Sequence, residues 1–557
     1  MCGIAGWVDW ERDLEQEIRL VEAMAAAVAC RGPDAAASWC TRHAAFGHRR
    51  LIVIDPLGGN QPMHRRHRGT DYTLVYNGEL YNTAELRREL SGRGHTFQGH
   101  SDTEVLLAAW AEWGPDCLDR LNGIFAFAVW DAGAEALYLA RDRLGVKPLF
   151  FAERGSGLLF GSELKALLAH PAVRAEIGAD GLAEVFALGP ARTPGHGIFR
   201  GVREVLPGTW LRYHRGGLSA HRYWALESRP HPDDLETTAA RVRELVIDSV
   251  ERQLISDVPI CTLLSGGLDS SGITAAAAAA FRRAGADRLT TYAVDYAQND
   301  RHFQPNPFQP EPDGPWIRRV AAYLDTAHRD VVLAIDALAA ALLPAMRARD
   351  LPGMADIDSS LLLFCRAIKE GATVALSGEC ADEVFGGYPW FRRPDALAAQ
   401  TFPWSLKLDL RLSVLSQALI EHIRPAEYVA ERYAEALAEV PRLPTEAPDA
   451  ARRREIAYLT LTRWMPVLLD RKDRMSMAAG LEVRVPYCDH RLVEYAWNIP
   501  WEMKECGGRE KGILRRALTG LLPDDVLQRK KSPYPKTHHP AYLDTVRRLL
   551  GDVLADP

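Results

Sequence analysis

The chain opens with Met1-Cys2-Gly3-Ile4-Ala5-Gly6, and the position of its cysteine is the most informative feature of the sequence. If Met1 is removed, Cys2 becomes the first residue and carries a free α-amine beside its thiol. In model peptides these two groups titrate at roughly pH 8 and 8.5, so the amine can serve as a base for its own nucleophile. The stretch therefore predicts a cysteine nucleophile that is activated by its own amine.

Length and composition limit the class of protein. At 557 residues the chain is long enough for more than one domain, and 47% apolar residues are ordinary for a globular protein. A net charge of −6 argues against a general nucleic-acid partner. The nine cysteines form no CxxC pair, which favours reduced thiols in a cytoplasm. We see no signal peptide and no apolar run of membrane-spanning length, so we expect a cytoplasmic protein without a membrane partner.

The first 215 residues or so predict a mixture of strands and helices. Strand-like runs cover residues 73–76, 124–130, 136–140 and 149–151. A helix is expected to begin at Ser101, because Ser101 and Glu104 match a capping box and apolar residues follow at helical spacing. A linker is predicted from about residue 214 to 234, because this stretch contains Gly216-Gly217 and two prolines.

The second half of the chain predicts a parallel sheet. A buried strand at 258–264 is followed by a glycine turn, an alanine-rich helix and a second strand at 289–295, and a later strand covers 373–376. This order of strand, loop, helix and strand favours parallel pairing with right-handed crossovers. The proline-rich segment 297–315 is predicted to be a flap or an insert, and residues 441–449 a polar connector.

Several polar residues in the first half suit the hydrolysis of an amide side chain on a free amino acid. Such a site needs a nucleophile, donors for a tetrahedral oxyanion, a cation for the α-carboxylate and an anion for the α-ammonium. The candidates are Cys2, Asn77-Gly78, Arg50 and Asp102. Each also has a simpler interpretation. Asp102 could only complement a helix dipole, Asn77-Gly78 could be a hairpin turn, and Arg50 could be a surface charge.

Five segments together resemble the class II glutamine amidotransferases. They are Cys2-Gly3-Ile4-Ala5-Gly6, Arg31-Gly32-Pro33-Asp34, His48-Arg49-Arg50-Leu51, Tyr76-Asn77-Gly78-Glu79 and Ser101-Asp102-Thr103-Glu104. The resemblance implies that Cys2 attacks the glutamine amide and that Asn77 and Gly78 form the oxyanion hole. It also implies that Arg50 binds the glutamine carboxylate, and that Asp102 and Glu79 bind its ammonium. The implied fold is the four-layer αββα sandwich of the amino-terminal nucleophile (Ntn) hydrolases.

A second motif, Ser265-Gly266-Gly267-Leu268-Asp269-Ser270-Ser271, follows a predicted strand and opens a helix. Its two glycines let the backbone approach an anion, and the amides at the helix start offer donors. It is not a Walker A loop, because no Gly-x4-Gly-Lys-Ser/Thr surrounds it. An ordinary tight turn is the alternative.

This motif is similar to the pyrophosphate loop of enzymes that split ATP into AMP and pyrophosphate. Further segments extend the resemblance to the synthetase domain of glutamine-hydrolysing asparagine synthetases. They are 377–388 (Ser-Gly-Glu-Cys-Ala-Asp-Glu-Val-Phe-Gly-Gly-Tyr), 473–477 (Asp-Arg-Met-Ser-Met), 482–486 (Glu-Val-Arg-Val-Pro) and 511–515 (Lys-Gly-Ile-Leu-Arg). The match covers essentially the whole chain and predicts a glutaminase domain over 2–215 and a parallel-sheet α/β ATP-pyrophosphatase domain over 234–557.

The resemblance assigns roles to residues in the second domain. Asp269 and Asp382 would bind Mg²⁺, which prefers hard carboxylate oxygens. Lys511 would neutralise charge at the α-phosphate, and Glu379 would act as base toward ammonia. ATP would contact Leu264, Ser265, Gly266, Gly267, Asp269, Ser270, Ser271, Val294, Ser377 and Gly378.

Simpler interpretations exist for these residues too. Lys511 could be a solvated helix lysine, and Glu379 with Asp382 could be an acidic pair at a helix start. For the basic run Arg529-Lys530-Lys531 with Lys536 we favour a solvated loop over a phosphate lid.

The resemblance implies an enzyme that converts aspartate to asparagine through β-aspartyl-AMP, using glutamine and ATP with Mg²⁺. An enclosed apolar passage would keep the ammonia neutral and away from water. The family often has Gly-Ser where this chain has Cys380-Ala381. The alternative is therefore the same chemistry on another carboxylate, such as a cell-wall precursor or a natural-product intermediate. A third hypothesis is a non-catalytic scaffold or nutrient-sensing binder. A homodimer is the default assembly.

Overall fold

The computed structural model describes residues 2–306 and 309–556, and its chain forms two compact units. The first unit comprises Met1–Ser228 and Trp390–Asp470, and the second comprises Arg229–Pro389 and Arg471–Pro557. Met1, whose removal would free the α-amine of Cys2, lies outside the described residues. Each unit is described by itself below.

The first unit contains two six-stranded antiparallel sheets. The first sheet has the order β10-β8-β9-β1-β3-β2, with bounds Arg203–Glu204, Phe150–Arg154, Gly157–Gly161, Cys2–Asp9, Ala44–Arg50 and Ala35–Cys40. The second has the order β12-β11-β7-β6-β5-β4, with bounds Gly217–Arg222, Thr209–His214, Ala136–Arg141, Gly123–Asp131, Thr70–Leu80 and Met63–His67. The predicted strands at 73–76, 124–130, 136–140 and 149–151 correspond to β5, β6, β7 and β8.

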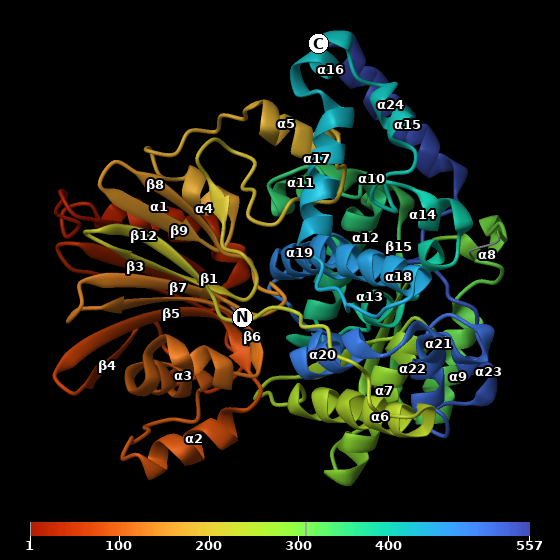
Figure 1. Cartoon of the computed structure of the whole chain (residues 1–557), viewed down its shortest axis with the longest axis horizontal. Coiled ribbons are helices and arrows are strands. Elements are labelled where there is room, and N and C mark those ends of the chain that lie inside the picture. Colours follow the sequence, from red (N-terminus) through yellow and green to blue (C-terminus); the bar gives the residue numbers. More distant parts are fainter. Residues whose placement is uncertain (1, 307–308, 557) are drawn as a thin grey trace. The chain divides into compact units, whose positions relative to one another are not determined.

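Side chains of the second sheet alternate between two hydrophobic cores. On β5, Val75 packs with Ile4 and Phe46 of the first sheet, whereas Leu74 and Tyr76 pack with the helices of the opposite face. This alternation follows from the two-residue period of a strand. Helices α2 (Thr83–Gly92) and α3 (Asp102–Trp113) cover this sheet, and α1 (Ile18–Ala27) and α4 (Leu164–Leu168) cover the first one (Figure 1). The four layers confirm the predicted αββα sandwich.

Two local predictions in this unit were wrong. Ser101 does cap α3, but its Oγ accepts from Thr103 N, while the Glu104 carboxylate accepts from the amides of Gln98 and Gly99 in the preceding loop. The capping box is therefore not reciprocal. The predicted linker from 214 to 234 also contains a strand, because Gly217, with φ of 110°, follows the tight turn of the β11–β12 hairpin.

The second unit contains a five-stranded sheet in which every neighbouring pair is parallel, as predicted. Its order is β15-β14-β13-β16-β17, with bounds Ala327–Leu333, Thr290–Tyr296, Ile260–Leu263, Val374–Leu376 and Glu482–Arg484. The chain starts at β13, adds β14 and β15 on one side, and later adds β16 and β17 on the other. Ligands bind such sheets beyond the carboxyl ends of the strands where the order reverses. Here that point lies between β13 and β16.

Helices supply the rest of both units. In the first unit they are α5 (Ala179–Phe186), α14 (Pro394–Ala398), α15 (Leu408–Leu412), α16 (Gln417–Ile423), α17 (Pro425–Ala438) and α18 (Pro448–Leu459). A π-helix at Thr460–Trp464 leads into α19 (Met465–Met477), which runs into the second unit. Short 3₁₀ turns cover Ala29–Arg31, Gly114–Arg120, Pro389–Phe391, Pro486–Cys488 and Cys506–Gly508.

The second unit has its own set of helices around the sheet. They are α6 (Leu235–Arg252), α7 (Leu268–Arg283), α8 (Asn299–His302), α9 (Gly314–Leu324), α10 (Ile335–Ala340), α11 (Leu342–Arg349), α12 (Asp356–Lys369), α13 (Ala381–Phe385), α20 (His490–Asn498), α21 (Trp501–Lys504), α22 (Gly512–Ala517), α23 (Asp524–Leu527) and α24 (Pro540–Ala555). The proline-rich segment 297–315 includes α8, and its residues 307 and 308 lie outside the described residues. Across the described ranges, no helix has the length and apolar character needed to cross a bilayer.

Candidate active sites

A pocket in the first unit brings together most of the residues predicted to bind glutamine. Cys2, Arg50, Gly78, Glu79 and Asp102 line a free volume of about 300 Å³. The pocket is completed by Leu51, Val53, Ile54, Gly59, Gln61, Tyr76 and Thr103. The sequence analysis did not assign a role to these seven residues.

Cys2 begins β1, where it pairs directly with Arg50 of β3. The backbone N–H of Cys2 donates to Asn77 Oδ1 at 3.0 Å. Asn77 Nδ2, on the same amide group, is buried without a hydrogen-bond partner among the described residues. A buried donor that lacks a partner is costly in the absence of a ligand, so this amide suits an oxyanion formed beside Cys2.

Burial also determines the state of the nucleophile. Burial raises the pKa of the Cys2 thiol above its ordinary value, despite the nearby positive charge of Arg50. The thiol is therefore protonated at neutral pH and needs a base before it can attack. Gly78 contributes by its lack of a side chain, because a Cβ there would lie 2.2 Å from Ile124 O and prevent β5 from approaching β6.

Arg50 presents a cation that the loop after β3 holds in place. Its Nη1 atom donates to Pro56 O at 2.9 Å and Asn60 Oδ1 at 2.8 Å, and its Nη2 atom donates to Asp55 O at 2.6 Å. Among the residues that the structure describes, no carboxylate forms an ion pair with this guanidinium. The charge of Arg50 is thus oriented but not neutralised, as a carboxylate-binding site requires. Arg50 is buried and is not a surface charge.

Asp102 stands at the first helical position of α3 and is also buried at the pocket. Its Oδ2 atom accepts from the Tyr76 hydroxyl at 3.0 Å and from Leu80 N at 3.1 Å. Burial raises the pKa of Asp102 against the effect of these two donors. A bound ammonium would stabilise the charged carboxylate. Asp102 is therefore suited to binding an ammonium and not only to complementing the helix dipole.

The second site lies at the reversal point of the parallel sheet. Gly266 has φ of 67°, and a Cβ there would lie 2.7 Å from the Trp316 backbone, so the turn after β13 requires glycine. The Ser265 and Ser270 hydroxyls lie 2.9 Å apart across this turn, and the buried Ser271 Oγ has no hydrogen-bond partner in the described part of the chain. α7 begins directly after the turn at Leu268.

The loop after β16 touches the first turn of α7, which directly follows the loop after β13. A Cβ on Gly378 would lie 2.8 Å from Ser270 N, so the two backbones meet without side chains between them. Ser377 N donates to Arg484 O at 2.9 Å, and Leu264 N donates to Tyr292 O at 2.8 Å. Val294 lies in β14, beside β13. The predicted ATP-binding residues are thus placed along one edge of the sheet.

Two predicted metal ligands, Asp269 and Asp382, converge on one ammonium group. Lys511 Nζ lies 2.7 Å from both Asp269 oxygens and 2.8 Å from Asp382 Oδ1. Burial alone would raise the pKa of Asp382, but Lys511 and Lys531 hold that pKa below its ordinary value. Two ionisable carboxylates that already share one cation fit a hard ion such as Mg²⁺.

For the basic residues around this cluster, the prediction of solvent-exposed side chains was partly wrong. Lys511 is buried and is not a solvated helix lysine. The prediction of a solvated loop was wrong for two residues of the run at 529–531. Lys531 Nζ lies 2.5 Å from Asp382 Oδ2, and Arg529 Nη1 donates to Ser265 O at 3.0 Å. Arg529 therefore contacts the predicted phosphate loop, and Lys531 contacts one of the two predicted metal ligands.

Glu379 occupies a different cationic environment from Asp382. Its carboxylate lies 2.8 Å from Arg471 Nη2 and 3.1 Å from Lys472 Nζ. Burial would raise the pKa of Glu379, but these two cations lower it below the ordinary value, which makes the carboxylate a weaker base. Its assigned role as base toward ammonia stays a prediction. Arg471 and Lys472 come from α19, far along the chain, and the sequence analysis did not identify them.

The family described as asparagine synthase matches residues 241–557, which is more than half of the chain. The chain belongs to the asparagine synthase family. A second family, described as a glutamine amidotransferase domain, matches residues 1–224. Both agree with the resemblance drawn from the motifs.

Relatives in the asparagine synthase family match over nearly the full length of the chain. It is 54% identical to asparagine synthetase [glutamine-hydrolyzing] 3 of Bacillus subtilis, over 99% of this chain and 90% of the relative. It is 30% identical to asparagine synthetase [glutamine-hydrolyzing] 1 of the same organism, over 96% and 87%. It is 28% identical to asparagine synthetase B of Escherichia coli, over 100% and 86%.

Cys380 is the first residue of Cys380-Ala381, the pair at which the motif resemblance predicts a departure from the family. It adopts φ of 77° between Glu379 and α13, and this turn separates Glu379 from Asp382. Its Sγ atom contacts Cys488 Sγ at 3.0 Å. Burial raises the pKa of the Cys380 thiol, so it is neutral and packs against another thiol.

Proposed function

We propose that this chain makes asparagine from aspartate, with glutamine as nitrogen donor and ATP as energy source, through β-aspartyl-AMP. The main support is that one chain carries a cysteine pocket suited to glutamine and a carboxylate–lysine cluster at a phosphate loop. Relatives over nearly its whole length are named glutamine-hydrolysing asparagine synthetases. Glutamate, AMP and pyrophosphate would be the other products.

In the first reaction Cys2 Sγ attacks the amide carbon of glutamine. Its proton passes to the α-amine that removal of Met1 leaves free, and the oxyanion is stabilised by Asn77 Nδ2 and the Gly78 backbone. Arg50 binds the glutamine carboxylate, and Asp102 and Glu79 bind its ammonium. Collapse of the intermediate releases ammonia, with the proton returned by the amine. Water then hydrolyses the thioester to glutamate and restores the thiol.

In the second reaction the ATP phosphates lie on the 265–271 loop. Asp269 and Asp382 would hold Mg²⁺, which supplies positive charge to the phosphates when bound. Lys511 and Lys531 neutralise charge that develops as the β-carboxylate of aspartate attacks the α-phosphorus and pyrophosphate leaves. Ammonia then attacks the acyl carbon, AMP leaves, and one proton is lost to give the amide.

The acceptor is tested by exchange of labelled pyrophosphate into ATP. This exchange requires a carboxylate that the enzyme adenylates, and it needs neither glutamine nor ammonia. We expect exchange with aspartate and none with glutamate, which differs by one methylene. Exchange only with a different carboxylate would overturn the aspartate assignment, and no exchange with any carboxylate would overturn the enzymatic proposal.

A further inference from the structure

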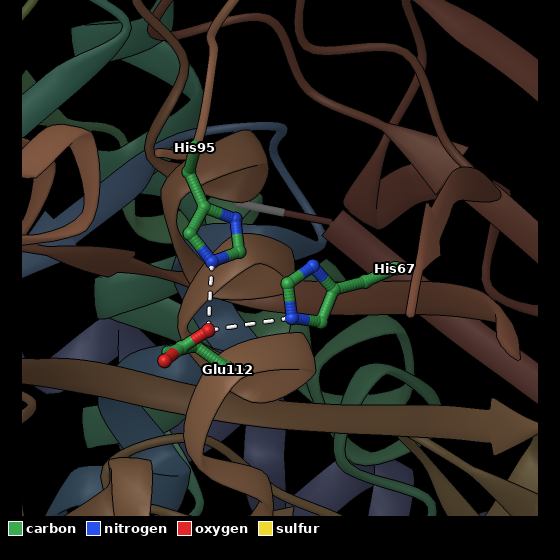
Figure 2. A group of neighbouring side chains, drawn as sticks. All are labelled: His67, His95 and Glu112. Atoms are coloured by element: carbon green, nitrogen blue, oxygen red, sulfur yellow. Dashed lines mark hydrogen bonds and ion pairs between the residues drawn. The ribbon is translucent and has the colours of Figure 1, made fainter. Parts of the chain in front are cut away.

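Three side chains with metal-ligating atoms meet in the first unit outside the glutamine pocket (Figure 2). His67 ends β4, His95 lies in the loop between α2 and α3, and Glu112 lies in the last turn of α3. Their ligand atoms all lie within 4.8 Å of one another. The fold therefore brings three separate segments to one point.

The distances in this cluster match those of a small coordination shell. Glu112 Oε2 lies 3.3 Å from His67 Nε2 and 3.2 Å from His95 Nε2, and both rings point at this oxygen (Figure 2). Zinc binds nitrogen and carboxylate oxygen at about 2.0–2.2 Å, so neighbouring ligands of a tetrahedral ion are about 3.3 Å apart. The distances from Glu112 Oε2 to His67 Nε2 and to His95 Nε2 already have about this value.

Burial and donor type also suit zinc. The side chains of His95 and Glu112 are 2% and 8% exposed, whereas that of His67 is 20% exposed, which leaves one open side for a water ligand. His67 Nε2 is itself shielded, and its 3.3 Å contact with Glu112 Oε2 is an ion pair that does not meet hydrogen-bond geometry. Two imidazoles and a carboxylate with an open fourth position are a common zinc ligand set, and Mg²⁺ or Ca²⁺ would prefer oxygen ligands alone.

We propose that His67, His95 and Glu112 bind one zinc ion in competition with neighbouring arginines. Arg68 Nη2 lies 3.3 Å from Glu112 Oε2 and Arg93 Nη1 lies 3.6 Å from Oε1, so both guanidiniums occupy the carboxylate in the absence of zinc. Their side chains are 71% and 45% exposed and can move into solvent. Arg65 Nη2 contacts His95 Nδ1 at 3.0 Å and must also withdraw, because a zinc-bound imidazole carries its proton on that nitrogen.

Zinc at this point would connect β4, the loop after α2 and the end of α3. Asp102 lies ten residues earlier on α3, about 15 Å away along the helix axis. The ion would therefore stabilise the helix that carries Asp102 without touching glutamine. Its expected effect is a higher melting temperature of the protein, with glutamine hydrolysis unchanged.

Zinc titration of the full chain by calorimetry tests the proposal. A melting curve is recorded at each ratio of zinc to protein. We expect one site that His67→Ala weakens by at least the roughly 10- to 100-fold that loss of an outer-shell partner costs. His64→Ala, on the same strand but outside the cluster, is the matched control and should bind as the wild type does. Arg68→Ala should bind zinc more tightly, because it removes a competing cation.

The arginine variant separates binding from misfolding when its melting curve without zinc matches that of the wild type. The comparison is needed because an unfolded chain would expose nine cysteines that also bind zinc. Zinc binding that His67→Ala leaves unchanged would overturn the proposal, because the ion would then be held elsewhere, for instance by thiols. Unchanged or weaker binding in Arg68→Ala would also contradict it.

Discussion

Cys2 illustrates how a buried residue depends on its neighbours for reactivity. Burial raises its thiol pKa, so at neutral pH the thiolate fraction is smaller than for an ordinary cysteine and increases only as the pH rises. The amide of Asn77 lies directly beside it, with one atom bonded to Cys2 N and the other without a partner in the described chain. The residue thus has an oxyanion donor in place but no side-chain base that we identify.

A chain in which one alanine is added before Cys2 tests whether the α-amine is that base. We expect glutamine hydrolysis at pH 7 to fall by about 10²- to 10⁴-fold, the usual contribution of a general base. Because the pKa of Cys2 is raised, the remaining activity should increase with pH through the alkaline range. Ammonia release across pH, compared with the unextended chain, measures this. Full activity of the extended chain at pH 7 would show that another group takes the proton.

Asn77→Ala tests the oxyanion donor. Loss of one such donor typically lowers kcat by about 10²- to 10³-fold, and KM for glutamine should change little. Asn60→Ala is the matched control, because Asn60 Oδ1 accepts from Arg50 and its loss should mainly raise KM. If steady-state kinetics show that Asn77→Ala raises KM and leaves kcat intact, Asn77 binds substrate and does not stabilise the oxyanion.

The residues found from sequence are those whose chemistry is visible in a short motif. Cys2, Arg50 and Asp102 were predicted on that basis and line one pocket. Tyr76 positions Asp102 across 26 residues, and Lys531 reaches Asp382 across 149. Both residues belong to segments noted in the sequence, but only the tertiary fold shows which carboxylates they contact.

At the scale of elements, the loops after β13 and β16 meet at the candidate nucleotide site because the strands are neighbours. The parallel order of these strands was predictable from the alternation of strand and helix, but their adjacency was not. In the β11–β12 hairpin, the local composition predicts the wrong element. Gly216-Gly217 has the composition of a linker, and only the pairing of β12 with β11 reveals that Gly216 ends a turn and Gly217 begins a strand.

Gly378→Ala tests whether contact between these two loops matters. Its Cβ would lie 2.8 Å from Ser270 N and 3.1 Å from Asp269 C, and these backbone atoms can move only with the first turn of α7. We expect at least a tenfold loss of ATP/pyrophosphate exchange, roughly the effect of 1.4 kcal/mol on a barrier, with glutamine hydrolysis retained. Gly551→Ala on α24 meets nothing within 4 Å and is the control. Normal exchange by Gly378→Ala would show that the loops need not touch for catalysis.

At the scale of the molecule, each compact unit carries one candidate active site. The chain leaves the first unit at Ser228, returns to it for Trp390–Asp470, and ends in the second. Tyr428 of the returning segment donates to the buried Glu184 of α5 at 2.6 Å, which ties these helices to the first unit. Domain limits at 215 and 234, an enclosed ammonia passage and a homodimer stay predictions from the sequence.

The central claim is that Cys2 supplies ammonia and the second unit consumes it. Synthesis of asparagine by Cys2→Ala, measured separately with glutamine and with ammonium chloride, tests this claim most directly. We predict no asparagine from glutamine and a rate within about twofold of the wild type from ammonium, because the substitution leaves the second unit unaltered. Loss of both activities in a folded variant, or retention of the glutamine-dependent one, would contradict the account.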